Sequence, residues 1–338
     1  MTLGNSEGLG PIVDRFGRVH TAMRISVTDR CNIRCFYCMP NESVRFLPNK
    51  EILSFEEIVS VVEMLSPLGV KKLRITGGEP LVRSQLYKLI RNLVAIPGIE
   101  DVALTTNGIL LKDQAQSLYE AGLHRLNVSL DTLDESLFER ITRRTGLARV
   151  LQGIEQAQNV GFSKIRLNAI AMAELTETEI VPLADFARKN NLELRFIEFM
   201  PLDAEESWQP GKVLTGAAIK GIIEDAFGLL EPVESTEPSQ PARNFRYADG
   251  MGQIGLINSV SEPFCSSCNR LRLTAEGKLR NCLFSTTEWD LRDLLRSGAS
   301  VEAIRHRVRE CVEAKKQSHG IDGHDFQRPA KAMYQIGG

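Results

Sequence analysis

A strand-like run followed by a helix-like run recurs six times along the first two thirds of the chain. The predicted strands are short and rich in β-branched residues, and they span 24–28, 71–76, 102–106, 125–130, 164–171 and 193–199. The predicted helices begin near residue 54, where Ser54 and Glu57 have capping-box spacing, and then span 82–95, 111–121, 134–141, 148–160 and 176–190. Repeated strand–helix units form a parallel sheet, either an incomplete barrel or an open doubly wound sheet.

The positions of the polar residues favour the barrel. One group lies at or after the end of each predicted strand. In chain order these groups are Cys31–Cys38, Gly77–Pro80, Thr105–Gly108, Ser129–Asp131, Asn168 and Glu198–Met200. An α/β barrel carries its active site at the carboxyl ends of its strands, so polar groups are expected there. We therefore predict an α/β fold, an incomplete (β/α)6 barrel of the TIM type.

The chain changes character after about residue 228. A stretch rich in proline and polar residues, 231–243, is predicted to be an irregular connection, and a short strand and a helix from about residue 288 are predicted beyond it. The predicted organisation is an N-terminal segment (1–20), the partial barrel (21–228) and a C-terminal extension (229–338).

Composition excludes several broad classes of protein. The 338 residues include 41 basic and 43 acidic side chains, and this balance does not predict a nucleic-acid or membrane-surface binder. No run approaches the roughly 20 apolar residues of a membrane span, and the N-terminus lacks the apolar core of a signal peptide. We expect a cytoplasmic protein with reduced thiols, so its seven cysteines are interpreted as ligands or catalysts before disulfides.

The first cysteine group is CNIRCFYC, which places Cys31, Cys35 and Cys38 at C-x-x-x-C-x-x-C spacing. Three thiolates on one loop can hold three irons of a cubane cluster. A structural metal site would close its fourth position with another Cys or His, and none is nearby. The spacing therefore predicts a cluster with one iron open to a small molecule. A zinc site completed from elsewhere in the chain, or thiols that only pack, are the alternatives.

The second group consists of Cys265, Cys268 and Cys282, again with no obvious fourth ligand. A zinc site completed by a histidine is the structural alternative, with His306, His319 and His324 as candidates. Arg270 and Arg272 lie between the cysteines at period two, so both point to one side of an extended segment. Arginine is well suited to bidentate contacts with phosphate, which favours a nucleotide site. The seventh cysteine, Cys311, lies in an apparently helical run and is predicted to be a packed thiol.

The first cysteine spacing resembles that of the radical S-adenosylmethionine (SAM) superfamily, in which the open iron binds the amino and carboxylate groups of SAM. TGGEP at 76–80 is similar to the superfamily loop that receives the methionine amino group, with Glu79 offering a carboxylate. The resemblance implies SAM-binding positions at Tyr37, Gly78, Ser129 and Met200. Asn107 and Asp131 are expected either to support the site or to be ordinary turn residues.

The pattern FCxxCNRxRLTxxGxLxxC, paired with TDRCNxRCxYCM, resembles the GTP 3′,8-cyclase family of molybdenum cofactor biosynthesis over residues 24–338. The last two residues, Gly337 and Gly338, resemble the Gly-Gly tail that enters the active site in this family. The resemblance implies GTP-contact positions at Arg24, Arg74, Thr105, Arg166, Arg270, Leu271 (through its backbone) and Arg272, with Arg195 as a further candidate. Arg166 departs from the lysine usual there, which keeps the charge but replaces a compact ammonium by a planar fork.

The resemblance also implies a mechanism and cofactors. Two [4Fe–4S] clusters and SAM are expected. Reductive cleavage of SAM gives a 5′-deoxyadenosyl radical that takes the ribose 3′ hydrogen of GTP, and the resulting carbon radical attacks carbon 8 of guanine. The C-terminal cluster is expected to bind the purine through its open iron. The rival hypotheses are another two-cluster radical enzyme that modifies peptides, or a non-enzymatic iron–sulfur redox sensor or electron carrier.

Four partners are implied in the same way. They are GTP as substrate, a reductant of flavodoxin or ferredoxin type, a downstream cyclic pyranopterin monophosphate synthase, and a second copy of the chain in a possible homodimer. No nucleic-acid or membrane partner is expected, because no basic stripe or membrane span occurs in the sequence.

Overall fold

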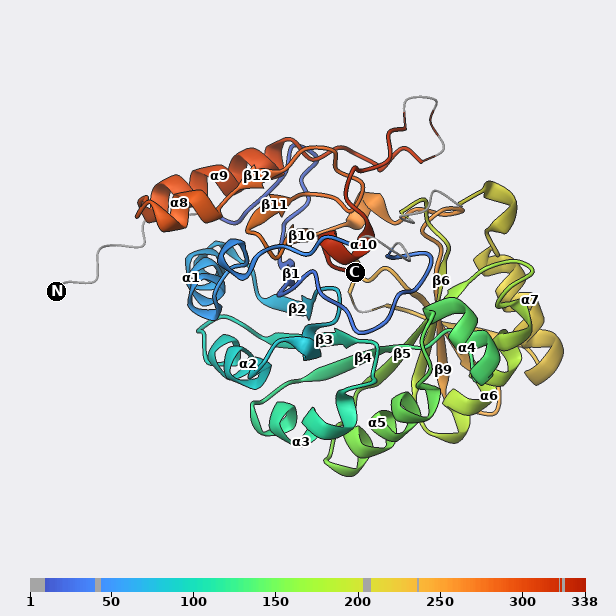
Figure 1. The fold of residues 1–338 in the computed structure, drawn as a ribbon. Coiled ribbons are helices and arrows are strands. Elements are labelled where there is room, and N and C mark those ends of the chain that lie inside the picture. The colour runs from blue at the N-terminus through green and yellow to red at the C-terminus, as the bar shows by residue number, and fades with distance from the viewer. Residues whose placement is uncertain (1–9, 40–43, 203–207, 236, 322, 324–325) are drawn as a thin grey trace.

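The computed structural model describes residues 10–39, 44–202, 208–235, 237–321, 323 and 326–338. Six parallel strands form the centre of one curved sheet, with helices along its outer face (Figure 1). The strands are β1 (Ala22–Ser26), β2 (Lys72–Thr76), β3 (Asp101–Thr106), β4 (Arg125–Ser129), β5 (Ile165–Ala171) and β6 (Glu193–Glu198). All six predicted strands are thus confirmed, with small shifts at their ends.

The helices between these strands agree with the predicted ranges to within a few residues. They are α1 (Phe55–Leu65), α2 (Leu86–Val94), α3 (Leu111–Glu120), α4 (Glu135–Thr142), α5 (Leu147–Asn159) and α6 (Ile180–Lys189). The predicted capping box is present, because the Ser54 hydroxyl accepts from Glu57 N and the Glu57 carboxylate accepts from Ser54 N. Short 3-10 helices occur at Asn49–Glu51, Ser66–Leu68, Pro80–Val82, Glu177–Glu179, Pro210–Lys212 and Cys265–Ser267.

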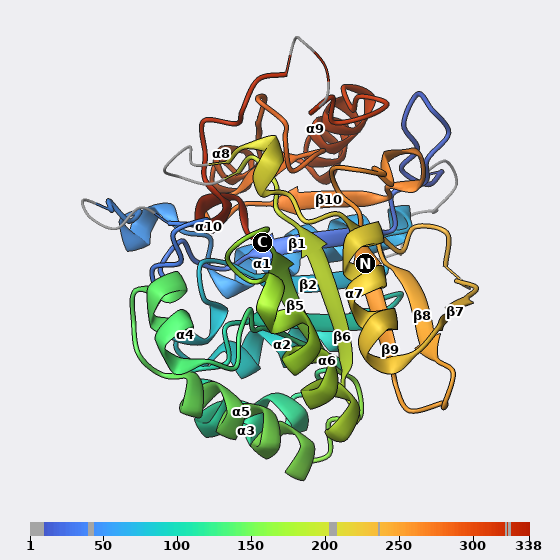
Figure 2. The ribbon, with the colours of Figure 1, turned by 90° about the vertical axis from the view of Figure 1, so that its right-hand side faces the viewer.

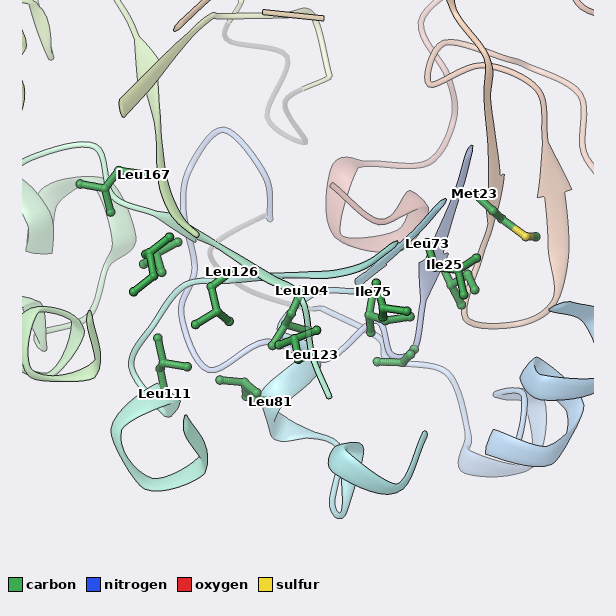
Figure 3. Packing of buried hydrophobic residues seen from close by; sticks show 14 of the residues in the cluster. Met23, Ile25, Leu73, Ile75, Leu81, Leu104, Leu111, Leu123, Leu126 and Leu167 are labelled. Carbon is green, nitrogen blue, oxygen red and sulfur yellow. The ribbon is translucent and has the colours of Figure 1, made fainter. Parts of the chain in front are cut away.

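The hydrophobic core lies between the sheet and these helices. Figure 3 shows Ile75, Leu104 and Leu126, from three neighbouring strands, packed on the side of Leu81 and Leu111. Each such side chain, when fully buried, stabilises the fold by about 1.5–3 kcal/mol. Because side chains alternate along a strand, the residues between them face the interior of the sheet's curve and are left available for a site.

Both edges of the six-stranded unit continue into strands from the last third of the chain. Beside β1 lies parallel β10 (Arg270–Leu273), followed by antiparallel β11 (Lys278–Arg280) and β12 (Trp289–Asp290). Beside β6 lies parallel β9 (Gln253–Ile257), followed by antiparallel β8 (Arg243–Tyr247) and β7 (Leu230–Val233) (Figure 2). The twelve-stranded sheet ends at β12 and β7 and does not close, so the fold is an incomplete TIM-type barrel.

The C-terminal region differs from the sequence prediction in two places. The connection predicted as irregular begins with β7, which pairs with β8 in a ladder that its prolines concealed. The helix predicted from residue 288 is wrong at its start: residues 289–290 form β12, and the helices are α8 (Arg292–Arg296) and α9 (Val301–Glu313). The remaining helices are α7 (Gly216–Phe227) and the short α10 (Met333–Ile336).

The two ends of the described chain lie in different places. Residues 10–21 run towards β1, and Gly338 lies in the middle of the curve of strands (Figure 1). In the described part of the chain, no helix combines the length and apolar character needed to cross a membrane. The predicted domain boundary near residue 228 stays a prediction, since strands from both sides of it join one sheet.

Candidate active site

All six cysteines of the two groups line one cavity of about 300 Å³. The first group approaches from the loop after β1, and the second from the segment that leads into and out of β10. The predicted residues Arg24, Tyr37, Arg74, Gly78, Thr105, Ser129, Met200, Arg270, Arg272 and Gly338 line the same cavity, as does Arg195. Groups that are far apart in sequence therefore meet in one cavity, with the first cysteine loop at the carboxyl end of β1 and the arginines within the strands.

The first cysteine loop is fixed by hydrogen bonds to its neighbours. Arg34 N donates to Thr142 O (2.8 Å), and Cys38 N donates to Cys35 O (2.9 Å). The Asn107 amide donates to the Cys31 sulfur (3.7 Å), so this residue does support the cysteine loop. Burial raises the pKa of Cys31 to about 11 and that of Cys38 to about 12. Iron binding at these thiols would therefore release protons.

The Gly77–Gly78 pair is required by packing against the segment that precedes Cys31. A Cβ on Gly78 would lie 2.4 Å from Arg30 O, and one on Gly77 would lie 2.6 Å from Thr28 O. Gly78 N also donates to Thr28 O (2.7 Å). The glycines thus bring the loop after β2 against the first cysteine loop, in addition to lining the cavity.

Glu79 is hydrogen-bonded within the protein, and its predicted contact with an ammonium stays a prediction. Its carboxylate is buried and accepts hydrogen bonds from Leu81 N, Thr106 Oγ1 and Asn107 N at 3.0, 2.7 and 2.6 Å. Burial raises its pKa to about 7 despite these donors. In this structure Glu79 joins the loops after β2 and β3 and holds Asn107 beside Cys31.

Replacing Gly78 with alanine is expected to lower the free energy of unfolding by about 1–3 kcal/mol, because the new methyl group would overlap a backbone carbonyl that cannot move aside easily. Chemical denaturation measures this change. Gly221→Ala is the matched control: this glycine lies inside α7 with open space around it, so alanine should stabilise by about 0.5–1 kcal/mol. Equal effects of the two substitutions would contradict the packing argument.

Tyr37 is oriented by Asp131. The tyrosine hydroxyl donates to Asp131 Oδ2 (2.6 Å), and Asp131 Oδ1 accepts from Ile170 N (2.8 Å). Burial raises the pKa of Asp131 to about 6. Tyr37 is therefore held by a residue just after the end of β4, which is itself bound to β5, and Ser129 and Met200 line the same cavity.

The second cysteine group is anchored to the end of β6 through Glu198. This buried carboxylate accepts from Gly216 N (3.0 Å), from Val260 N and Ser261 N (both 2.8 Å), and from Ser261 Oγ (2.5 Å). It thereby fixes the turn that leads towards Cys265. A carboxylate at the end of an apolar strand was the only sequence signal for this role.

The register of β1, β2 and β10 places arginines next to one another on the inner face of the sheet. Arg24 of β1 is aligned with Arg74 of β2 on one side and with Arg272 of β10 on the other. Arg270 lies two residues before Arg272 and points to the same side. The side chain of Leu271, between them, is buried in the core, so only its backbone can reach the cavity.

The charges of these arginines are only partly compensated within the protein. Neither Arg24 nor Arg74 has an ion-pair partner among the described residues. Burial, followed by the charges of Arg272 and Arg270, lowers the pKa of Arg24, and burial followed by Arg24 lowers that of Arg74. Arginine does not lose its proton in proteins, so the repulsion persists. Such a cluster favours the binding of a polyanion.

A smaller cavity of about 90 Å³ shares Arg24, Arg74, Arg195 and Arg270 with the main one. Arg166 lines this smaller cavity, where its Nε lies 2.6 Å from the Glu193 carboxylate. The Arg195 guanidinium also contacts Glu193 (2.6 Å). Arg166 is therefore beside the arginine cluster rather than on the wall that carries the cysteines.

The two terminal glycines enter the interior of the sheet, as Figure 1 shows for the C-terminal end. Thr76 Oγ1 donates to Gly338 O (2.8 Å), and Arg272 Nη1 donates to Gly337 O (2.6 Å). Gly337 has a φ of +88°, and a Cβ there would lie 2.9 Å from the Ser26 Cβ. Glycine is thus the residue that this tail position accommodates.

Comparison with known proteins identifies the family. A family model described as Radical SAM superfamily matches residues 25–187, and one described as Molybdenum Cofactor Synthesis C matches residues 192–321. A protein from Rhodopirellula baltica named GTP 3′,8-cyclase is 52% identical over 330 residues, which cover 97% of this chain and 92% of that protein. Another of the same name, from Pelotomaculum thermopropionicum, is 44% identical, with 96% and 99% covered.

The chain belongs to the GTP 3′,8-cyclase family. It is a radical SAM enzyme, and radical SAM enzymes of this kind use SAM and iron–sulfur clusters. Among solved structures, Streptococcus suis SuiB bound to S-adenosylmethionine has a TM-score of 0.60 at 16% identity, covering 85% of this chain and 68% of that one. At this identity the likeness concerns the fold alone, and it agrees with the incomplete barrel of this GTP 3′,8-cyclase family member.

The donor set of the cavity fits iron–sulfur clusters better than zinc. His319 lines the cavity, but its Nε2 lies 3.0 Å from Ser259 O and its Nδ1 accepts from Ile321 N (3.1 Å), so both ring nitrogens are engaged. His306 is exposed on α9, and His324 lies outside the described residues. Within the described ranges no three His, Cys, Asp or Glu side chains converge on one ion, whereas a cubane cluster presents a separate iron to each thiolate.

Two further features of this family member bear on the sequence predictions. Cys311 is fully buried in the hydrophobic core, as predicted for a packed thiol. The hydroxyl of Thr105 is buried on the cavity wall without a hydrogen-bond partner among the described residues. A buried donor of this kind carries a free-energy cost that a bound ligand can remove.

Proposed function

We propose that this chain catalyses the GTP 3′,8-cyclase reaction, in which SAM is cleaved reductively and GTP is converted to (8S)-3′,8-cyclo-7,8-dihydroguanosine 5′-triphosphate. One observation supports this most directly: both cysteine groups and the partly uncompensated arginines line a single cavity. A redox sensor or electron carrier would need neither open irons nor an anion site in the same cavity. The product would enter molybdopterin synthesis.

The first half of the proposed site binds SAM. Cys31, Cys35 and Cys38 would hold a [4Fe–4S] cluster with one open iron, and the reduced cluster supplies the electron that splits SAM. The backbone at Gly78 would approach the methionine part, with Ser129 and Met200 on the adjacent wall. The Tyr37 ring, held by Asp131, would lie beside the adenine. These residues position the cofactor and exclude water from the site.

The second half of the proposed site binds GTP. Cys265, Cys268 and Cys282 would hold a second [4Fe–4S] cluster whose open iron binds the purine. GTP would be contacted by Arg24, Arg74, Thr105, Arg166, Arg270, the Leu271 backbone and Arg272, with Arg195 beside them, and the arginines would bind the triphosphate. Arg166 would make its contact from the smaller cavity, where it is paired with Glu193.

The tail of the proposed site consists of Gly337 and Gly338. Arg272 contacts both the tail and the cavity, so it would link the position of the tail to that of the nucleotide. In this proposal the tail closes the interior of the sheet and does not itself exchange protons or electrons.

Several partners complete the proposal. A flavodoxin or ferredoxin type of protein would supply the electron, and a cyclic pyranopterin monophosphate synthase would take the product. A homodimer and a cytoplasmic location are proposed on the same resemblance. Pull-down of the purified chain with each candidate, and its mass by light scattering, test these proposals.

The function is tested by product analysis. The protein is reconstituted anaerobically with iron and sulfide, reduced with dithionite, and given SAM together with GTP, ATP or no nucleotide. Mass spectrometry measures 5′-deoxyadenosine and any cyclised nucleotide. Cyclised product from GTP alone is the expected result. Equal 5′-deoxyadenosine with and without nucleotide, and no cyclised product, would reject GTP as the substrate.

A further inference from the structure

A buried lysine lies against the second cysteine group. Lys315 follows the end of α9 and is 3% exposed. Its Nζ donates to Arg270 O (3.0 Å) and contacts the Cys268 sulfur (3.6 Å). Lysine is almost never fully buried unless its charge is paired, so its position here requires a compensating partner.

That partner is a sulfur atom rather than a carboxylate. Among the described residues, no Asp or Glu lies within ion-pair distance of Lys315 Nζ. The buried carboxylate of Asp14, in the N-terminal segment, is bound to Arg18 at 2.6 Å and to His20 at 3.2 Å. As a thiolate, the Cys268 sulfur can balance the charge of Lys315, and the Arg270 guanidinium is a second cation beside the same sulfur.

The lysine is held in place by the N-terminal segment. Arg18, fixed by Asp14, donates to Lys316 O (2.8 Å) and Gln317 O (3.1 Å), which immediately follow Lys315. The same guanidinium donates to Cys265 O (2.7 Å). The backbone beside Lys315 and the loop of the second cysteine group are thus both hydrogen-bonded to the buried Arg18 side chain. These bonds fix the position of Lys315 relative to Cys268.

In the first cysteine group, a ligand sulfur also has a hydrogen-bond donor at a similar distance, but that donor is neutral. The Cys31 sulfur accepts from the neutral amide of Asn107 at 3.7 Å. A hydrogen bond from a cation is roughly twice as strong as one from a neutral donor. The two groups therefore differ in the charge of the donor that contacts a ligand sulfur, although Arg34 lies near Cys31 through its hydrogen bond to the Cys31 carbonyl.

We infer that Lys315 is a positioning residue that donates an N–H···S hydrogen bond to the Cys268 ligand and raises the reduction potential of the second cluster. Hydrogen bonds to ligand sulfur and nearby charge both set cluster potentials, and a cation stabilises the more negative, reduced cluster. This inference rests on the proposed function, because it requires a cluster at Cys265, Cys268 and Cys282.

The test isolates the second cluster in the full-length chain. Cys31, Cys35 and Cys38 are replaced by alanine, and Lys315→Met and Lys315→Arg are made in that parent. Midpoint potentials are measured by redox titration followed by electron paramagnetic resonance. Lys315→Met is expected to lower the equilibrium constant for reduction of the cluster about tenfold. For a one-electron couple this makes the midpoint potential about 59 mV more negative. Lys315→Arg keeps the cation and should shift the potential by less than half of this. A Lys315→Met potential equal to that of the parent would overturn the inference.

Two further measurements distinguish the failure of the cluster to form from the failure of the inference about Lys315. Iron analysis of the parent shows whether the second cluster forms, and a parent without iron would reject the proposed cluster site together with the inference. If Lys315→Met alone loses its cluster, the parent labelled with 15N-lysine is examined by pulsed electron paramagnetic resonance. A lysine 15N coupling to the reduced cluster supports the hydrogen bond, and its absence overturns the inference.

Discussion

Replacing Cys31 with alanine is expected to abolish both 5′-deoxyadenosine and cyclised nucleotide, with a loss of more than about a thousandfold in rate. The reason is chemical: the substitution removes one of three ligands of the cluster that supplies the electron to SAM, and the cavity offers no replacement thiol on that loop. Mass spectrometry of both products under dithionite measures the loss. Retained 5′-deoxyadenosine would show that Cys31 is not a ligand of the SAM-cleaving cluster.

Two matched cysteine variants make this result specific. Cys265→Ala should lose cyclised product and about half of the bound iron, because the first cysteine loop remains complete. Cys311→Ala should keep its iron and both products, since this thiol packs in the core away from the cavity. Its expected effect is a loss of about 1 kcal/mol in the free energy of unfolding. A fall in iron content in Cys311→Ala would contradict its assignment as a packed thiol.

Replacing Arg74 with methionine is expected to weaken GTP binding roughly 10- to 100-fold, because a charged hydrogen bond to phosphate contributes about 1.5–3 kcal/mol. Isothermal titration of GTP onto the anaerobic, reconstituted protein measures the change. The stability of the unliganded protein is expected to stay the same or to rise. Arg74 has no ion-pair partner among the described residues and is repelled by Arg24, so its removal relieves an unfavourable interaction.

The exposed Arg91 of α2 is the control for charge alone. It lies outside both cavities, and Arg91→Met should leave GTP affinity unchanged while altering the net charge equally. Weaker binding in Arg74→Met accompanied by a lower free energy of unfolding would indicate a folding defect instead of a lost phosphate contact.

The barrel and most of its site were predictable from the sequence because each strand carries its own signal. β-Branched runs with helical stretches between them fixed the order of β1 to β6, and polar residues at their carboxyl ends marked the site. The cysteine spacings predicted the two groups without reference to the fold. The structure then placed all six of these cysteines on one cavity.

The features that could not be predicted depend on contacts between segments that are distant in sequence. Nothing local indicates that β10 pairs with β1, or that Glu198 fixes the turn before Cys265. The hydrogen bonds of Glu79 were not predictable for the same reason, because two of its three donors, Thr106 and Asn107, lie at the end of β3. The prolines of 231–243 concealed β7, since proline is expected to end a ladder rather than to lie in one.

The pairing of β1 with β10 has a consequence for biosynthesis. Ser26 leaves the ribosome long before Arg270, and at about 5–20 residues per second the interval is on the order of tens of seconds. During that time β1 has an unpaired edge, and the first cysteine loop lacks the C-terminal segments that later cover it. An unpaired edge is a template for association with other chains. The edge of β1 is therefore protected from such association only after β10 has been synthesised and has paired with it.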